Sequence, residues 1–155
     1  MIVLKRIFDL PLLLKWRKEV IENVFGETPS VALMASNEDY YSRHIADGTH
    51  IAVVALAGEE EAGCGSLCLT EELPSPDNPT GKCGYLMNIY VRKPFREKGI
   101  AHYIVRGLIE EAKKRKCGKI YLETTAEGRP VYESLGFHDL PDMMKYESSD
   151  FSDKY

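Results

Sequence analysis

The sequence predicts an α/β (α+β) domain in which a mixed, mostly antiparallel central sheet is flanked by helices. Segments 51–57 and 65–69 have strand-like patterns, and the polar connection between them suits an antiparallel hairpin. Further along, a strand-like segment at 83–91 is followed by a helical pattern at 99–116 and a short strand at 119–124. This order implies a right-handed crossover between two parallel strands.

The N-terminal segment predicts a strand and then an amphipathic helix. Residues 2–8 are apolar and β-branched enough for a first strand. Asp9 can cap a helix that carries Pro11 in its first turn, and Gly26 is placed to end it. The apolar positions of this helix recur at helical spacing: Leu13, Trp16, Val20 and Val24. Because polar residues interrupt the apolar run early, we expect neither membrane insertion nor export.

The remaining elements follow from capping and breaking signals. Ser36 and Asp39 form a possible capping box, which predicts a second helix from Ser36 to Gly48. Three prolines in segment 70–81 indicate a connector rather than a strand. We expect a last short helix at 129–135.

The C-terminal end predicts two more strands. A terminal pair around Phe137 and 142–146 would bring the sheet to six to seven strands, flanked by about four helices. Residues 1–147 are then one domain, and the polar residues 148–155 are expected to be a frayed tail.

Composition restricts the function classes. The chain has 155 residues, 44% of them hydrophobic, which suits one folded domain. The net charge of −4 argues against a general nucleic-acid binder. The four cysteines lack paired spacing and no histidine cluster accompanies them, so we expect no metal site and reduced thiols in a cytoplasmic protein.

A basic, glycine-containing loop lies between the strand at 83–91 and the long helix. It contains Arg92, Lys93, Arg96 and Lys98, and Gly99 opens the helix. Free N–H groups at a helix start can bind an anion such as a pyrophosphate. The alternative is an ordinary helix start with a glycine. The glycine strings of nucleotide-hydrolysing P-loops and of dinucleotide folds do not occur here.

A second motif, Tyr132-Glu-Ser-Leu-Gly-Phe137, follows one crossover strand after this loop. Together with the strand YLMNIYV, the two motifs resemble the GNAT superfamily of acyl-CoA-dependent N-acyltransferases. The resemblance spans Tyr85 to Phe137, and the order of the elements agrees with it.

The resemblance implies a binding site for coenzyme A (CoA). The family's [Q/R]-x-x-G-x-[G/A] loop holds the CoA pyrophosphate by its backbone amides, and here it comprises Arg96, Glu97, Lys98, Gly99, Ile100 and Ala101. The preceding strand would bind the pantetheine arm through Ile89, Tyr90 and Val91. At a bulge in this strand, the Ile89 amide would act as the oxyanion donor to the thioester carbonyl.

The same resemblance suggests catalytic roles. Tyr132 stands where relatives place the acid that protonates the departing CoA thiolate, and its alternative is a packed core aromatic. Thr125 stands where relatives have an asparagine, and its hydroxyl could replace that CoA contact. Tyr85 replaces a general-base glutamate of some relatives, which leaves Glu123 as the base candidate or as an exposed strand-end acid. The acceptor region would include Tyr40, Tyr41 and His44.

The expected function is therefore an N-acetyltransferase that moves an acetyl group from acetyl-CoA to a primary amine by direct attack. The acceptor can be a small molecule or a peptide, and the assembly a monomer or a homodimer. Cys83 or Cys117 would act as a nucleophile only in a ping-pong scheme, and neither has a base nearby in sequence. The alternative is a non-catalytic acyl-CoA-binding module or regulatory domain, which would have no use for an acid at Tyr132.

Overall fold

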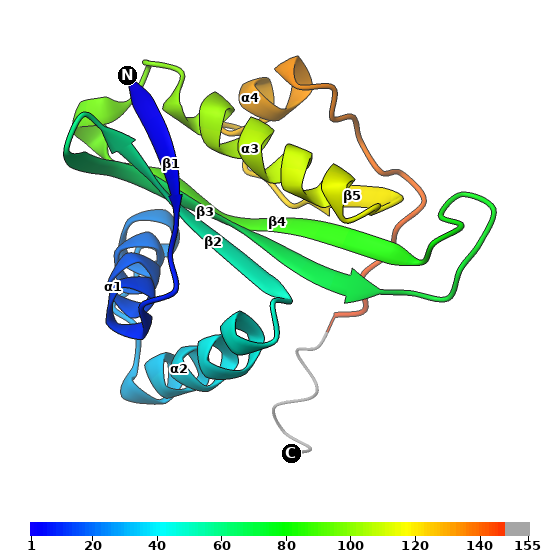
Figure 1. Ribbon diagram of the computed structural model, residues 1–155, viewed down its shortest axis with the longest axis horizontal. Helices are drawn as coiled ribbons and strands as arrows, with labels where there is room; N and C mark the ends of the chain where they lie inside the picture. The colour runs from blue at the N-terminus through cyan, green and yellow to red at the C-terminus, as the bar shows by residue number, and fades with distance from the viewer. Residues whose placement is uncertain (148–155) are drawn as a thin grey trace.

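The computed structural model describes residues 1–147. Within them, five strands form one sheet in chain order: β1 (Ile2–Arg6), β2 (His50–Ala57), β3 (Glu60–Glu71), β4 (Lys82–Val91) and β5 (Lys119–Leu122) (Figure 1). The first three neighbouring pairs are antiparallel, whereas β4 and β5 run parallel. The predicted mixed, mostly antiparallel sheet is therefore confirmed.

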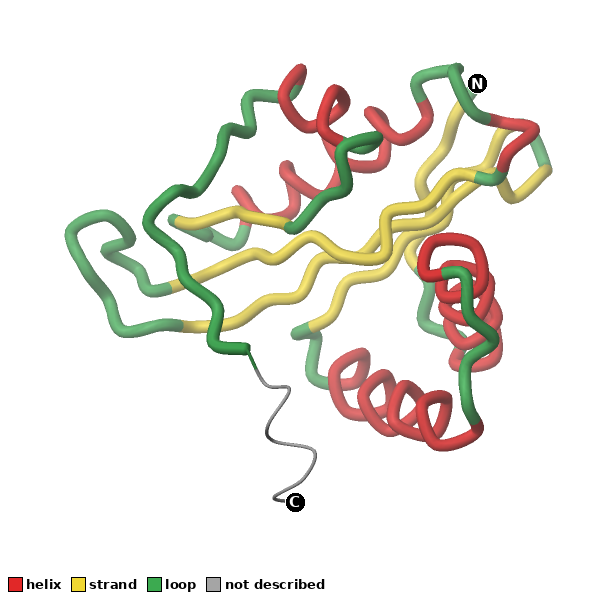
Figure 2. Tube along the Cα trace, turned by 180° about the vertical axis from the view of Figure 1, so that it is seen from behind, coloured by secondary structure: helices red, strands yellow, loops and turns green. Residues whose placement is uncertain are grey.

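Helices cover both faces of this sheet (Figures 1 and 2). One face carries α1 (Leu10–Val20), the π-helical turn η1 (Ile21–Phe25) that extends it, and α2 (Val31–Ala46). The other face carries α3 (Ile100–Lys114) and the short α4 (Arg129–Ser134). The 3₁₀ turn η2 (Lys93–Phe95) links β4 to α3.

The sheet divides the core in two because its strands turn alternate side chains to opposite faces. On the α3 face, Ile104 and Leu108 are fully buried in one cluster with Leu67. On the α1 face, the buried Trp16 packs edge-to-face on Tyr90, with ring centroids 6.4 Å apart. These contacts hold α1 and α3 on opposite faces of the sheet.

The helix boundaries test the capping predictions. Asp9 caps α1 as expected, because its carboxylate accepts from the Leu12 amide at 3.0 Å, and Gly26 ends η1 in the left-handed conformation. The predicted start of the second helix is wrong. Ser30 caps α2 by accepting from the Leu33 amide at 3.0 Å, so Ser36 lies inside the helix.

The predicted terminal pair of strands is absent from the described residues. The segment after α4 has no strand up to residue 147, so the described sheet has five strands rather than six or seven. Pro141 lacks a backbone donor, and Arg129 of α4 forms an ion pair with Asp139 that ties this segment to the helix. The predicted frayed tail, residues 148–155, lies outside the described residues.

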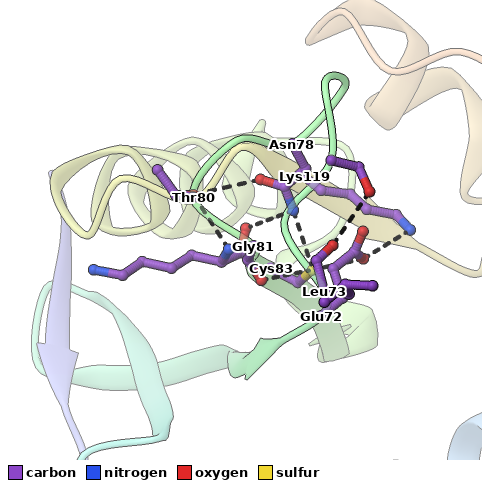
Figure 3. A network of polar contacts seen from close by, with 9 residues as sticks. Glu72, Leu73, Asn78, Thr80, Gly81, Cys83 and Lys119 are labelled. Carbon is purple, nitrogen blue, oxygen red and sulfur yellow. Dashed lines mark hydrogen bonds and ion pairs between the residues drawn. The ribbon is translucent and has the colours of Figure 1, made fainter.

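Polar contacts attach the connector before β4 to the sheet (Figure 3). The Glu72 carboxylate accepts from the Cys83 thiol at 3.0 Å and from Lys119 at 3.2 Å, which joins the starts of β4 and β5. The buried Asn78 amide donates to the Lys82 carbonyl at 3.2 Å. Burial, together with Glu72, raises the pKa of Cys83 to about 11, so this thiol stays protonated at neutral pH.

Candidate active site

A β-bulge interrupts the pairing of β3 with β4. Ser66 pairs with Met87 and Cys64 pairs with Tyr90, so the single residue Gly65 lies opposite two residues of β4. Those two residues are Asn88, whose φ is +60°, and Ile89. An extra residue of this kind bends the strand and leaves a backbone group outside the ladder.

The bulge also reverses which face each later side chain meets. Met87 lines a pocket beneath α1 and α2, yet Ile89 and Val91 pack against the core on the α3 face. Tyr90 faces α1. A regular strand would place Tyr85, Met87, Ile89 and Val91 on one side, and the bulge breaks this alternation. One inserted residue flips every side chain that follows it.

Just before the bulge, after Leu86, β4 loses its pairing with β5. Their parallel pairing covers only Cys83 to Leu86 of β4 and ends at Leu122 of β5. A cleft of about 590 Å³, called the β4 cleft here, is lined by the separating strand ends together with α1, α3 and α4. The predicted site residues that line it are Ile89, Tyr90, Val91, Arg96, Ala101, Glu123, Thr125 and Tyr132.

The loop at 96–101 borders this cleft at the start of α3. Gly99 is the N-cap with a φ of +78°, and no side chain caps the helix. The first N–H groups of α3, beginning at Ile100, therefore have no partner from the helix itself and can bind an anion. Ile100 is buried in the core, whereas Glu97, Lys98 and Gly99 are exposed and do not line the cleft.

Two arginines near the loop have different roles. Arg96 is exposed and donates from Nε to the Val91 carbonyl at 2.9 Å, at the edge of the cleft. Arg92, by contrast, forms two 2.8 Å hydrogen bonds with the Glu19 carboxylate and lies over the Trp16 ring at 4.3 Å. Its charge attaches β4 to α1, so Arg92 does not belong to the predicted basic anion site.

Tyr132 lies on α4 at the wall of the cleft. Its ring packs edge-to-face on Phe137, with centroids 5.9 Å apart, and it also borders a smaller hollow between α4 and β5. Burial raises the pKa of Tyr132, so the phenol is protonated at neutral pH. A protonated phenol at this wall can donate a proton into the cleft, and it also packs the helix.

Two further candidates lie where β5 ends. Glu123 is exposed at the cleft and lies close to Tyr85. The pKa of Tyr85 is raised to about 12, mainly because the phenol is buried and also because the Glu123 carboxylate is near it. Thr125 is exposed, and its hydroxyl accepts from the Gly128 amide at 3.3 Å. The structure therefore brings a carboxylate and a hydroxyl to the same cleft wall.

A second pocket of about 360 Å³ adjoins the β4 cleft. We call it the aromatic pocket, and its lining consists of Arg17, Asn37, Tyr40, Tyr41, His50, Cys68, Tyr85, Met87 and Asn88. Arg17, Tyr85, Met87 and Asn88 line both spaces, so the two communicate beside the bulge.

Sequence reasoning located this pocket only in part. Tyr40 and Tyr41 line it, but His44 does not, because His44 packs on Tyr40 and bonds to the Thr49 hydroxyl at 2.6 Å. Arg17 and His50 were missed. One signal in the sequence could have indicated Arg17. It follows the core residue Trp16 and therefore lies at the border of the apolar face of an amphipathic helix.

A hydrogen-bond chain begins at the wall of the aromatic pocket and runs into the protein interior. The Tyr40 hydroxyl contacts His50 Nδ1 at 2.8 Å, and His50 Nε2 contacts the Ser66 hydroxyl at 3.0 Å. Burial lowers the pKa of His50 to about 4, so the imidazole is neutral at pH 7. The polar groups of this wall bond to one another and carry no formal charge, and the aromatic rings of Tyr40 and Tyr41 also line the pocket.

Comparison with known proteins identifies the family. A family model described as the acetyltransferase (GNAT) family matches residues 16–137, which is most of the chain. The protein belongs to the GNAT acetyltransferases. The helix N-terminus, the bulge and the separating strands described above all lie within the matched region.

Individual relatives agree with this membership. An uncharacterized N-acetyltransferase, YsnE, of Bacillus subtilis is 33% identical over 54% of this chain and 52% of its own length. A probable glucosamine 6-phosphate N-acetyltransferase of rice, Oryza sativa subsp. japonica, is 37% identical over 37% of this chain and 34% of its own. The chain thus spans about half or less of the length of these curated relatives.

A solved structure matches nearly the whole fold. A crystal structure from Clostridium acetobutylicum, of a predicted acetyltransferase with acetyl-CoA, superposes with a TM-score of 0.85 and 25% identity. The match covers 97% of this chain and 98% of that one.

Two kinds of feature are absent from the described residues. No helix within residues 1–147 is long and apolar enough to cross a membrane. No group of three or more potential metal-ligating side chains was found in that same range.

Proposed function

We propose that this GNAT protein transfers the acetyl group of acetyl-CoA to the primary amine of a small molecule. The observation that carries the proposal is the continuity of the β4 cleft with the aromatic pocket beside the bulge at Asn88 and Ile89. A cleft for the donor that opens directly onto a second pocket lets an acceptor reach the thioester. A non-catalytic acyl-CoA-binding module needs no such second pocket.

The residues around the β4 cleft suit acetyl-CoA. The uncapped start of α3 offers N–H groups to a pyrophosphate, and Arg96 adds a positive charge at the same edge. Beyond Leu86, β4 has lost its parallel partner, so the strand segment from Ile89 to Val91 can pair with the amide groups of a pantetheine arm. Acetyl-CoA supplies the activated acetyl thioester when it is bound.

The chain's own groups then have distinct tasks in the transfer. The Ile89 amide, at the bulge, stabilises negative charge on the thioester oxygen as a neutral amine attacks. Tyr132, whose burial keeps it protonated, donates its proton to the departing CoA sulfur. Glu123 takes a proton from an acceptor that arrives as ammonium, directly or through one water. The new C–N bond forms first, in a tetrahedral intermediate, and the C–S bond breaks as this intermediate collapses. The extra proton on the attacking nitrogen then passes to water.

The comparisons support a small amine as the acceptor. The rice relative is named for transfer to glucosamine 6-phosphate, which is a primary amine on a small sugar. A pocket of about 360 Å³ lies at the low end of the usual size for small-molecule sites, about 300–1,000 Å³.

The test is release of free CoA thiol from acetyl-CoA across a panel of primary amines, with mass spectrometry of each product. We expect at least one small amine to release thiol in proportion to its N-acetylated product. Binding of acetyl-CoA without amine-dependent thiol release across the panel would favour the non-catalytic module.

A further inference from the structure

Arg17 occupies the junction of the β4 cleft and the aromatic pocket. Its guanidinium donates to the side-chain oxygen of Asn88 at 2.8 Å and to that of Asn37 at 3.2 Å. Both partners are neutral amides. Within residues 1–147, Arg17 takes part in no ion pair. Arg92, by contrast, forms an ion pair with Glu19 of the same helix α1. The two amides therefore orient the Arg17 charge without neutralising it.

The rest of the aromatic pocket is electrically neutral at pH 7. Burial raises the pKa of Tyr40 and Cys68 and sets that of Tyr41 at about 12. Burial lowers the pKa of His50 to about 4. The other lining residues are Asn37, Asn88, Met87 and Tyr85, so Arg17 alone carries a formal charge among the lining residues within 1–147. An apolar, aromatic space with one cation favours a ligand that has an apolar body and one anionic group.

We propose that Arg17 binds a carboxylate of the acceptor and thereby determines the specificity of the enzyme. The acceptor is then an apolar α-amino acid. This inference rests on the proposed function. The apolar side chain would occupy the space among Tyr40, Tyr41 and Met87. The amine of an α-amino acid lies one carbon from its carboxylate, and Asn88, which touches Arg17, is itself a bulge residue. Binding at Arg17 therefore places the amine next to the Ile89 amide.

The carboxylate takes no part in the bonds that change. The amine nitrogen forms the new bond to the acetyl carbon, the CoA sulfur leaves, and the proton lost by nitrogen passes to Glu123 or to water. Arg17 acts on binding, so its removal should raise the KM of an anionic acceptor more than it lowers kcat. An amino sugar phosphate also carries an anionic group, but its sugar is polar, whereas the side chain of the proposed acceptor is apolar. A direct test can therefore distinguish the two kinds of acceptor.

The experiment compares matched acceptors in the thiol-release assay. Apolar amino acids such as L-leucine and L-phenylalanine are set against isopentylamine and phenethylamine, which lack only the carboxylate, and against glucosamine 6-phosphate. We expect kcat/KM for the amino acid to exceed that for its decarboxylated analogue by about 10-fold to 100-fold, the usual worth of a charged hydrogen-bonded contact. Equal or better use of the decarboxylated amines, or preference for glucosamine 6-phosphate, would overturn the amino-acid assignment.

Three variants locate the effect. In Arg17→Gln the ratio of kcat/KM for the amino acid to kcat/KM for its decarboxylated analogue should fall to about one, and Arg17→Lys should restore part of this ratio. Lys18→Gln removes a neighbouring exposed charge of α1 and should keep the full preference. If Arg17→Gln lowers activity equally on both members of a pair, Arg17 is structural and the inference fails. If the parent binds acetyl-CoA but acetylates no amine at all, the proposed function fails, and this substrate class with it.

Discussion

The bulge makes Gly65 a sensitive position, because this residue alone faces two residues of β4. A Cβ added at Gly65 would lie 2.5 Å from Cγ2 of Ile104, 2.9 Å from Cδ1 of Ile89 and 3.2 Å from Cδ1 of Leu108. Ile104 and Leu108 are completely buried, so they have little room to retreat. Gly65→Ala should therefore displace Ile89, whose amide is the proposed oxyanion donor.

The size of the effect follows from two opposing contributions. Overpacking a tight core costs about 1–3 kcal/mol, while replacing a strand glycine by alanine returns about 0.5–1 kcal/mol. Because two of these contacts are shorter than 3.0 Å, the overpacking cost lies in the upper part of its range, at about 2–3 kcal/mol. We therefore expect Gly65→Ala to lower the free energy of unfolding by about 1–2.5 kcal/mol, which is a fall in Tm of about 2–10 °C for a chain of this length. A displacement of the Ile89 amide by a fraction of an ångström should lower kcat by about 10-fold or more.

Gly84→Ala is the matched control. Gly84 lies at the paired end of β4, where an added Cβ would meet Leu67 at 3.0 Å and Ala112 at 3.3 Å on the same α3 face. This variant should lose stability but keep kcat. Urea unfolding and steady-state turnover with the best acceptor would measure both quantities. An unchanged Tm in Gly65→Ala would refute the packing argument, and an equal loss of kcat in both variants would refute the coupling to Ile89.

Three more predictions concern single groups. Tyr132→Phe should lower kcat by about 10²-fold to 10⁴-fold with acetyl-CoA affinity kept, as measured by kinetics and calorimetry, since only the hydroxyl is lost; an unchanged kcat when chemistry limits the rate would make Tyr132 a packing residue. The folded pKa of His50, about 4, lies below its ordinary 6.5, so stability should be full above pH 6.5 and fall by up to about 3 kcal/mol towards pH 4. His50→Gln should flatten this profile in urea unfolding, and an equally steep fall would assign it to other groups. Glu19→Gln removes the partner of Arg92 and should lower the free energy of unfolding by about 1–3 kcal/mol. Asp39→Asn, in an exposed ion pair, should lower it by under about 1 kcal/mol. Thermal unfolding measures both, and equal losses would contradict the larger value expected for Glu19.

Local signals predicted much of the fold because their physics is local. Asp9 and Gly26 bound the first helix as expected, since a cap and a left-handed glycine act on adjacent backbone groups. The change from strand to helix spacing between 91 and 99 located the crossover and the helix start that borders the β4 cleft. The mistaken start of α2 shows the limit, because Ser30 and Ser36 both satisfy the cap composition and only the folded chain selects one.

The parts that could not be predicted depend on contacts distant in sequence. Asn88 resembles any strand residue until Gly65 is placed opposite it, and the reversal of faces follows from that pairing. Arg17 and Asn88 are separated by 71 positions and meet only because α1 packs on β4. The predicted terminal strands failed for a similar reason, since an ion pair between Arg129 and Asp139 ties their first segment to α4.

The central claim is that the uncapped start of α3 binds acetyl-CoA, and calorimetric titration of acetyl-CoA tests it most directly. Gly99 and Gly58 both have positive φ values, +78° and +65°, with open space around a would-be Cβ. Valine at either position therefore carries similar backbone strain, but only Gly99→Val crowds the anion site. We predict tight binding by the parent and by folded Gly58→Val, and strongly weakened binding by folded Gly99→Val. Equal affinity in all three proteins would contradict the account.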